Sequence, residues 1–153
     1  MTEDRNILVS ACLFGENCSY DGFARENPKV VQFCRDKSVI RVCPEMLAGI
    51  GCPRERHEIV GGDGGDVLEG NARVFSISGK DRTGQFVSGA EETLCLAQKN
   101  DCSVAILKEK SPSCGVRLIH SGKFNSVTIP GLGVTAALLK TSGIKVIPDT
   151  EIL

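Results

Sequence analysis

The chain has 153 residues, which is enough for one domain with a buried core, and 18 Lys and Arg stand against 19 Asp and Glu. The net charge of -1 argues against a protein whose main function is to bind nucleic acid, because such proteins usually carry an excess of clustered basic residues. The sequence has neither a membrane-spanning apolar segment nor a secretory signal at its polar start. We therefore expect a single cytoplasmic domain over residues 1–153.

The first quarter of the chain predicts a strand, a helix and a second strand. Residues 7–10 are an apolar run that predicts a strand. Residues 28–37 predict a helix, with Asn27 as its N-cap and a proline at its first position. Residues 39–43 predict the second strand.

The middle of the chain begins with a glycine-rich stretch. Residues 61–66 lack the Lys-Ser/Thr ending of a phosphate-binding loop, so they predict a mobile surface loop. Residues 71–78 predict a third strand. Residues 83–99 predict a long helix capped by Thr83, because apolar residues recur there at helical spacing.

The last third predicts two strands around a helix. Residues 104–108 predict a strand, and the apolar run at its start is expected for a central parallel strand. A helix over 134–140 follows the glycines of 131–133, whose amides are expected to be open to a carbonyl or an anion. Residues 145–147 close the sheet. Strands alternating with helices predict a single three-layer Rossmann-like α/β domain with a mostly parallel sheet.

Eight cysteines in a chain of this kind need an explanation, because cytosolic thiols stay reduced and a disulfide framework is not expected. Cys12 and Cys114 follow predicted strands, and Cys43 ends the second predicted strand. Since the carboxyl ends of parallel strands meet at the ligand-binding edge of a sheet, we expect these three cysteines to come together there. The alternative is that all three are buried strand-end residues.

Three thiolates without a Cys-x-x-Cys pair, and with only two histidines, favour an iron–sulfur cluster over a zinc site. Proline and glycine flank the three cysteines, so nearby amides are expected to bond to cluster sulfurs. Cys34 and Cys95 fall in predicted helices and are expected to pack in the core, and Cys102 is expected at the opposite edge of the sheet. The roles of Cys18 and Cys52 stay open.

Five segments, taken in order, resemble a bacterial family whose characterised members are 2-thiouracil desulfidases. The likeness extends from residue 7 to residue 147, and two of its motifs are highly specific, the one around Cys12 and SPSCG. The segments are SACLFGENCSYDG, VCPE, PRERHEIVGG, LKEKSPSCG and GLGVTAALL.

This resemblance implies a compact α/β fold and a 4Fe–4S cluster held by Cys12, Cys43 and Cys114, with one iron left without a protein ligand. It also implies a hydrolytic, non-redox exchange of sulfur for oxygen on a thiolated nucleobase such as 2-thiouracil. The chain departs from the common pattern at Phe14, at Ser19, at residues 51–52 and at residues 55–57. These positions flank the site, so the identity of the thiolated base stays open.

Water needs a base to attack the ring carbon, and Glu45, two residues after Cys43, is the first candidate. Asp21 in the YDG turn is the second, and Ser113 is a candidate donor to the substrate or to a sulfide. The alternatives are a charge at a helix N-terminus for Glu45 and turn formation for Asp21 and Ser113.

The expected partner is therefore a small thiolated base, with neither a membrane nor a nucleic acid expected. Two other functions fit the cysteine pattern. One is a sulfur carrier acting on tRNA, which the near-neutral charge disfavours. The other is a metal-binding or redox-sensing module without desulfidase activity.

Overall fold

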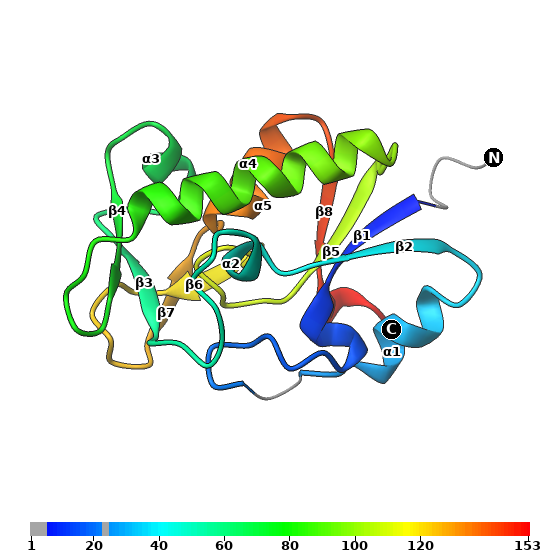
Figure 1. Cartoon of the computed structure of the whole chain (residues 1–153), viewed down its shortest axis with the longest axis horizontal. Coiled ribbons are helices and arrows are strands. Elements are labelled where there is room, and N and C mark those ends of the chain that lie inside the picture. Colours follow the sequence, from blue (N-terminus) through cyan, green and yellow to red (C-terminus); the bar gives the residue numbers. More distant parts are fainter. Residues whose placement is uncertain (1–5, 23–24) are drawn as a thin grey trace.

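A computed structural model describes residues 6–22 and 25–153 of the chain (Figure 1). Its centre is a parallel four-stranded sheet in the order β2-β1-β5-β8. Every strand end lies within one residue of its predicted place, and the mostly parallel sheet confirms the expected α/β fold. The strands are β1 (Asn6–Ser10), β2 (Ser38–Val42), β5 (Val104–Leu107) and β8 (Lys145–Pro148).

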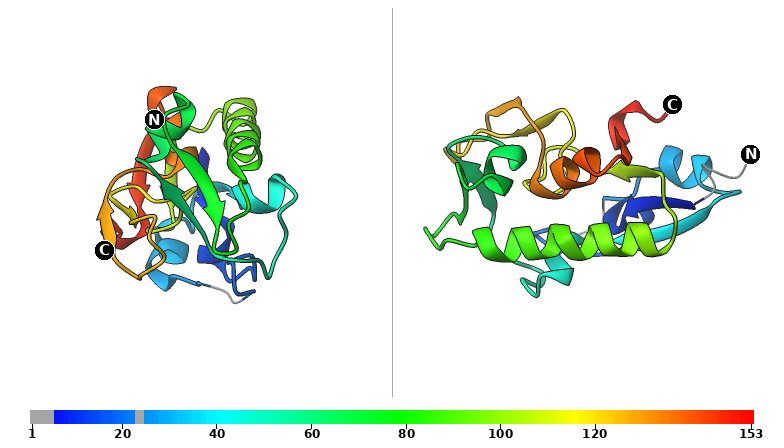
Figure 2. Two further views of the ribbon diagram at one scale, coloured as in Figure 1. Left: turned by 90° about the vertical axis from the view of Figure 1, so that its left-hand side faces the viewer. Right: turned by 90° about the horizontal axis from the view of Figure 1, so that it is seen from above.

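Helices cover both faces of this sheet (Figures 1 and 2). Side chains alternate between the faces of a strand, and β1 follows this rule. Ile7 and Val9 pack with Val30 of α1, whereas Leu8 packs with Leu139 of α5. The helices that matter here are α1 (Pro28–Phe33), α4 (Thr83–Lys99) and α5 (Val134–Thr141).

Helix α1 begins as predicted, because the side chain of Asn27 accepts hydrogen bonds from the amides of Lys29 and Val30. The helix ends at Phe33, four residues earlier than expected. Helix α4 has the predicted bounds, but Thr83 is its first residue and not its cap. The hydroxyl of Thr83 instead accepts from the amide of Val74 and donates to Asp81.

Two small antiparallel sheets lie beyond the central sheet, and α4 reaches over both regions (Figure 1). The strand predicted over 71–78 exists, but it pairs in one of these small sheets and not in the central one. Its inner face, with Val74, packs against Phe86 and Ala90 of α4. The pairs are β3 (His57–Val60) with β4 (Arg73–Ser76), and β6 (Leu118–His120) with β7 (Thr128–Pro130).

The glycine-rich stretch is structured, which corrects the prediction of a mobile loop. Helix α3 (Gly64–Leu68) begins inside it with a capping box, in which the side chains of Asp63 and Asp66 each accept the other's amide. A Cβ atom on Gly64 would lie 2.1 Å from the carbonyl oxygen of Gly133. The glycine there permits close packing of α3 on the start of α5.

A second close approach fixes the short helix α2 (Pro44–Leu47), which follows β2. A Cβ atom on Gly89 of α4 would lie 2.4 Å from the carbonyl oxygen of Pro44. Helix α2 therefore rests directly on the backbone of α4, and any side chain at position 89 would displace it. In the described part of the chain, no helix has the length and apolar character needed to cross a membrane.

Candidate active site

A cavity of about 370 Å³ opens at the carboxyl ends of β1, β2 and β5. The structure brings Cys12, Cys43 and Cys114 together in its lining, although they are far apart in the sequence. Cys18 lines the same cavity, so four thiols face it. The parallel order of the three strands is what places these residues at one edge.

Cys12 lies in a short 3-10 helix, η1 (Ala11–Phe14), that continues directly from β1. Its carbonyl oxygen accepts hydrogen bonds from the amides of Gly15 and Arg25, at 3.1 and 3.2 Å. Gly15 has a φ of +91°, a left-handed conformation that favours glycine. The sharp turn after Cys12 thus keeps this residue at the end of its strand.

Cys43 links β2 to α2 and is the N-cap residue of that helix. Its carbonyl oxygen accepts the amide of Leu47, the first hydrogen bond of the helix. The sulfur lies 3.6 Å from the carbonyl oxygen of Cys18 and 3.9 Å from Oε1 of Glu45. Cys43 therefore stands between the Cys18 turn and the carboxylate predicted to act as a base.

Cys114 is held in a tight turn by two serines. The hydroxyl of Ser111 accepts hydrogen bonds from the amides of Ser113 and Cys114, both at 3.0 Å. Ser10 at the end of β1 accepts the amide of Lys108 at 2.9 Å, and its hydroxyl opposes the rise in the pKa of Cys114. The hydroxyl of Ser111 thus forms part of the turn that carries Cys114.

Glu109 holds the segment after Cys114 and was not singled out from the sequence. Its buried carboxylate accepts hydrogen bonds from the amides of Val116, Arg117 and Leu118, at 2.7 to 3.2 Å. Its own amide donates to Asp149 at 2.9 Å. One carboxylate therefore satisfies several backbone donors of the same partly buried turn.

We expect Glu109→Ala to lower the free energy of unfolding by about 2 kcal/mol, because it removes the charged acceptor that these partly buried amides share. Urea unfolding of the cluster-free protein measures this loss. The matched control is Glu92→Ala on the exposed face of α4, where the change should stay within about 0.5 kcal/mol. Equal stability of the two variants would show that Glu109 does not hold this segment.

Cys18 interacts with two of the predicted cluster ligands. Its thiol is hydrogen-bonded to the side chains of Cys12 and Cys43, and these bonds raise the pKa of Cys18. The same bonds lower the pKa of Cys12 and of Cys43. Burial and the nearby charge of Glu45 raise the pKa of Cys114. The pKa values of the four thiols thus depend on one another and on the charge of Glu45.

Glu45 lies in the first turn of α2, so the predicted position at a helix N-terminus is observed. Its side chain is only 9% exposed, and Oε2 lies 3.6 Å from Nη2 of Arg54. Both residues line the cavity. The carboxylate is therefore buried, paired and next to Cys43.

Two predicted site residues lie elsewhere. Asp21 and Ser113 are not among the described residues that line the cavity. Asp21 forms an ion pair of 2.5 Å with Arg25, which does line the cavity. Ser113 is 1% exposed, and its hydroxyl has no hydrogen-bond partner among the described residues. It packs against Gly133, behind the Cys114 turn.

The amides of the glycine loop before α5 bind protein carbonyls, which corrects the expectation that they are open to a ligand. Gly133 donates to Gly115, Val134 donates to Pro112, and Ala136 donates to Ser113, at 2.8 to 3.0 Å. The loop acts as a support that ties the start of α5 to the Cys114 turn.

The remaining cysteines occupy varied places. Cys34 is buried in one of the cores that flank the sheet, as expected. Cys102 lies just before β5, at the expected opposite edge of the sheet, and is buried in the other core. Cys95 is exposed on α4, so its predicted place in the core was wrong. The sulfur of Cys52 lies 2.8 Å from the carbonyl oxygen of Asn17, near the Cys18 turn.

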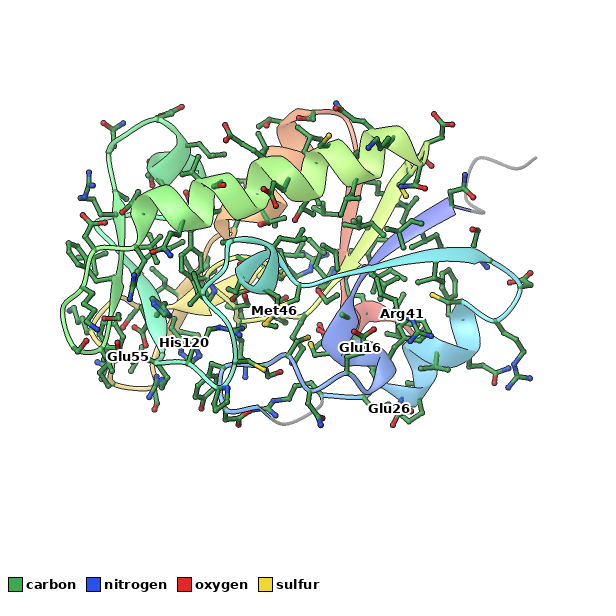
Figure 3. All side chains as sticks on the ribbon, in the orientation of Figure 1. Glu16, Glu26, Arg41, Met46, Glu55 and His120 are labelled. Atoms are coloured by element: carbon green, nitrogen blue, oxygen red, sulfur yellow. The ribbon has the colours of Figure 1, made fainter. Side chains whose placement is uncertain are left out.

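The lining of the cavity also forms a wall of charged residues and histidines. Glu55 and His120 belong to this wall and lie on one side of the molecule in Figure 3. His57 also lines it and packs on Phe86 with 5.2 Å between ring centroids. Burial lowers the pKa of His57. Its other charged residues include Arg25, Arg56, Lys108 and Lys110.

Within residues 6–22 and 25–153, no three His, Cys, Asp or Glu side chains are placed to hold a single metal ion. In a 4Fe–4S cluster each thiolate binds a different iron, so its ligands stand farther apart than those of one ion. The soft thiol set around this cavity suits iron and sulfide better than hard cations.

Comparison with known proteins agrees with this geometry. Residues 7–151 match the 2-thiouracil desulfurase family. An uncharacterized protein of Bacillus subtilis (strain 168), YbbK, is 45% identical over 146 residues, which cover 95% of this chain and 97% of that protein. The solved structure of the 4Fe-4S-dependent thiouracil desulfidase TudS is 34% identical, with a TM-score of 0.83, and covers 97% of this chain and 93% of its own. The chain belongs to the 2-thiouracil desulfurase family.

Proposed function

We propose that this protein is a desulfidase that replaces the sulfur of a thiolated nucleobase such as 2-thiouracil with oxygen from water, releasing hydrogen sulfide. In this proposal Cys12, Cys43 and Cys114 hold a 4Fe–4S cluster, and one iron has no protein ligand. The observation that carries the proposal is the meeting of these three thiols at one cavity, in a chain whose structural relative TudS is described as 4Fe-4S-dependent.

The residues present fit such a cluster. The three cysteines come from separate segments, each fixed by its own turn, and the hydroxyl of Ser111 accepts the amide of Cys114. When bound, the cluster supplies a soft Lewis-acidic iron that suits the sulfur of a thiolated base. Cys18 already contacts Cys12 and Cys43, so a fourth thiol is close to the proposed ligands.

The chain's own residues supply the proton chemistry. Glu45 is the proposed base, because its carboxylate lines the cavity beside Cys43 and can take a proton from the attacking water. Asp21 would act through Arg25, which its carboxylate holds at the cavity. The hydroxyl of Ser113 lies outside the cavity lining. The contact of Ser113 with substrate therefore has no support from the cavity and stays a prediction.

Anaerobic reconstitution of the full chain, followed by ultraviolet absorbance of 2-thiouracil, tests the proposal. We expect conversion to uracil with release of one sulfide for each base, and none by the same protein without iron. Protein with a full load of iron and sulfide that leaves 2-thiouracil unchanged would contradict this substrate. Binding of zinc in place of iron under the same conditions would favour the metal-binding module.

A further inference from the structure

Arg54 is a buried cation that was not assigned a role from the sequence. Its side chain is only 7% exposed, although it lines the cavity. Its Nη1 donates hydrogen bonds to the carbonyl oxygens of Cys18 at 3.0 Å and Gly51 at 2.8 Å. Its Nη2 lies 3.6 Å from Oε2 of Glu45. One guanidinium thus joins the Cys18 turn, the loop after α2, and α2 itself.

The two oxygens of Glu45 have different surroundings. Oε2 faces Arg54, whereas Oε1 lies 3.9 Å from the sulfur of Cys43. The two oxygens are chemically equivalent, but a flexible side chain could rotate the whole carboxylate away from the cysteines. Pairing with a guanidinium that is itself held by two carbonyl groups opposes that rotation.

We propose that Arg54 is a positioning residue for the proposed desulfidation. It binds Oε2 of Glu45 and so directs Oε1 to the cysteine side of the cavity, where water must be activated. The same guanidinium holds the Cys18 carbonyl in place beside Cys43. This inference rests on the proposed function, because it assigns Arg54 a part in that reaction.

Neither the neighbouring Arg56 nor a lysine at position 54 could position Glu45 in the same way. Arg56 is already paired with Glu58 at 3.1 Å, and Glu58 also accepts the amides of Gly122 and Phe124. A lysine at position 54 would keep the charge, but its single ammonium could not reproduce the forked geometry of Arg54 toward Glu45 and two carbonyl groups.

The first test compares Arg54→Gln and Arg54→Lys with the reconstituted wild-type chain. We expect kcat for 2-thiouracil to fall by about 100-fold in Arg54→Gln, with a smaller fall in Arg54→Lys, because the base is misplaced while the binding site persists. KM and the iron content per chain should change little. Arg73→Gln is the control, since Arg73 forms an exposed ion pair with Asp81 outside the cavity lining.

Chemical rescue separates positioning from a general loss of structure. In Arg54→Ala, millimolar guanidinium should raise kcat by binding in the space left by the side chain. The same addition should leave the wild type and Arg73→Gln unchanged. If Arg54→Ala does not fold, the kcat of Arg54→Lys decides the question instead.

The melting temperature of cluster-free protein tests the interaction between Arg54 and Glu45 directly, without measuring activity. In cluster-free protein, Glu45→Gln and Arg54→Gln should each lower the melting temperature, and Arg54→Gln by roughly 5–15 °C, because a buried ion loses its partner. The double variant should lose less than the sum of the two single losses. Strictly additive losses would show that the two side chains do not depend on each other, and would overturn the inference.

The outcomes distinguish the two proposals. Wild-type protein that carries iron and is inactive would refute the proposed function, while the melting temperatures still test the pair. Active wild type together with an iron-loaded Arg54→Gln of unchanged kcat would overturn the positioning role. Loss of iron in parallel with activity in both Arg54 variants would also overturn it, because Arg54 would then serve to retain the cluster.

Discussion

Cys114→Ala is expected to abolish desulfidation and to lower the iron content of the reconstituted protein. The side chain of Cys114 is buried in a turn fixed by Ser111, so a neighbouring residue cannot move into its place. Two thiolates alone would leave a second iron without a protein ligand and open to oxidation. Iron and sulfide analysis of anaerobically prepared protein, together with uracil formation, measures both effects.

Cys95→Ala serves as the matched control, because Cys95 is exposed on α4 and does not line the cavity. It should keep full iron content and full activity. If Cys114→Ala keeps its iron and its activity, the third cluster ligand must instead be assigned to Cys18, which contacts Cys12 and Cys43. The double variant lacking Cys18 and Cys114 would then be the one that loses the cluster.

Glu45→Gln is expected to lower kcat by about 10²–10⁴-fold while the cluster is retained, because an amide cannot accept the proton of the attacking water. Glutamine has nearly the same shape, and its carbonyl oxygen can still face Arg54 as Oε2 does at 3.6 Å, so the site should keep its geometry. Single-turnover conversion of 2-thiouracil by protein of known iron content measures the chemical step.

Glu92→Gln on the exposed face of α4 is the control and should leave kcat unchanged. An active Glu45→Gln with a full cluster would remove Glu45 from the proposed mechanism. Asp21→Asn would then be the next variant to measure, since Asp21 holds Arg25 at the cavity.

The central sheet could be predicted closely from the sequence because its strands are short apolar runs between polar or glycine-containing segments. The small sheets could not, because β3 and β7 have few apolar residues and their pairing depends on contacts with distant segments. The glycine-rich stretch misled the prediction in a similar way. Gly64 is needed for close packing on Gly133, and the sequence alone does not distinguish that use from flexibility.

The meeting of the three cysteines followed from topology alone, since each follows a parallel strand. Arg54 and Glu109 could not be found in this way, because a charged residue gives no sign in the sequence that it will be buried. Their roles come from tertiary contacts: Arg54 binds carbonyl groups of two loops, and Glu109 binds a run of amides. The sequence also named Ser113 where the structure places Ser111 in the lining.

The wide separation of the three cysteines along the chain bears on when the protein can mature. Cys12 and Cys43 leave the ribosome early, but the strand that carries Cys114 to the cavity is β5, which lies between β1 and β8 in the sheet. On the proposed assignment, a nascent chain that ends before β5 has only two ligands and cannot retain a cluster. Iron and sulfide must therefore be delivered to a nearly complete chain, so cluster loading follows synthesis of most of the domain.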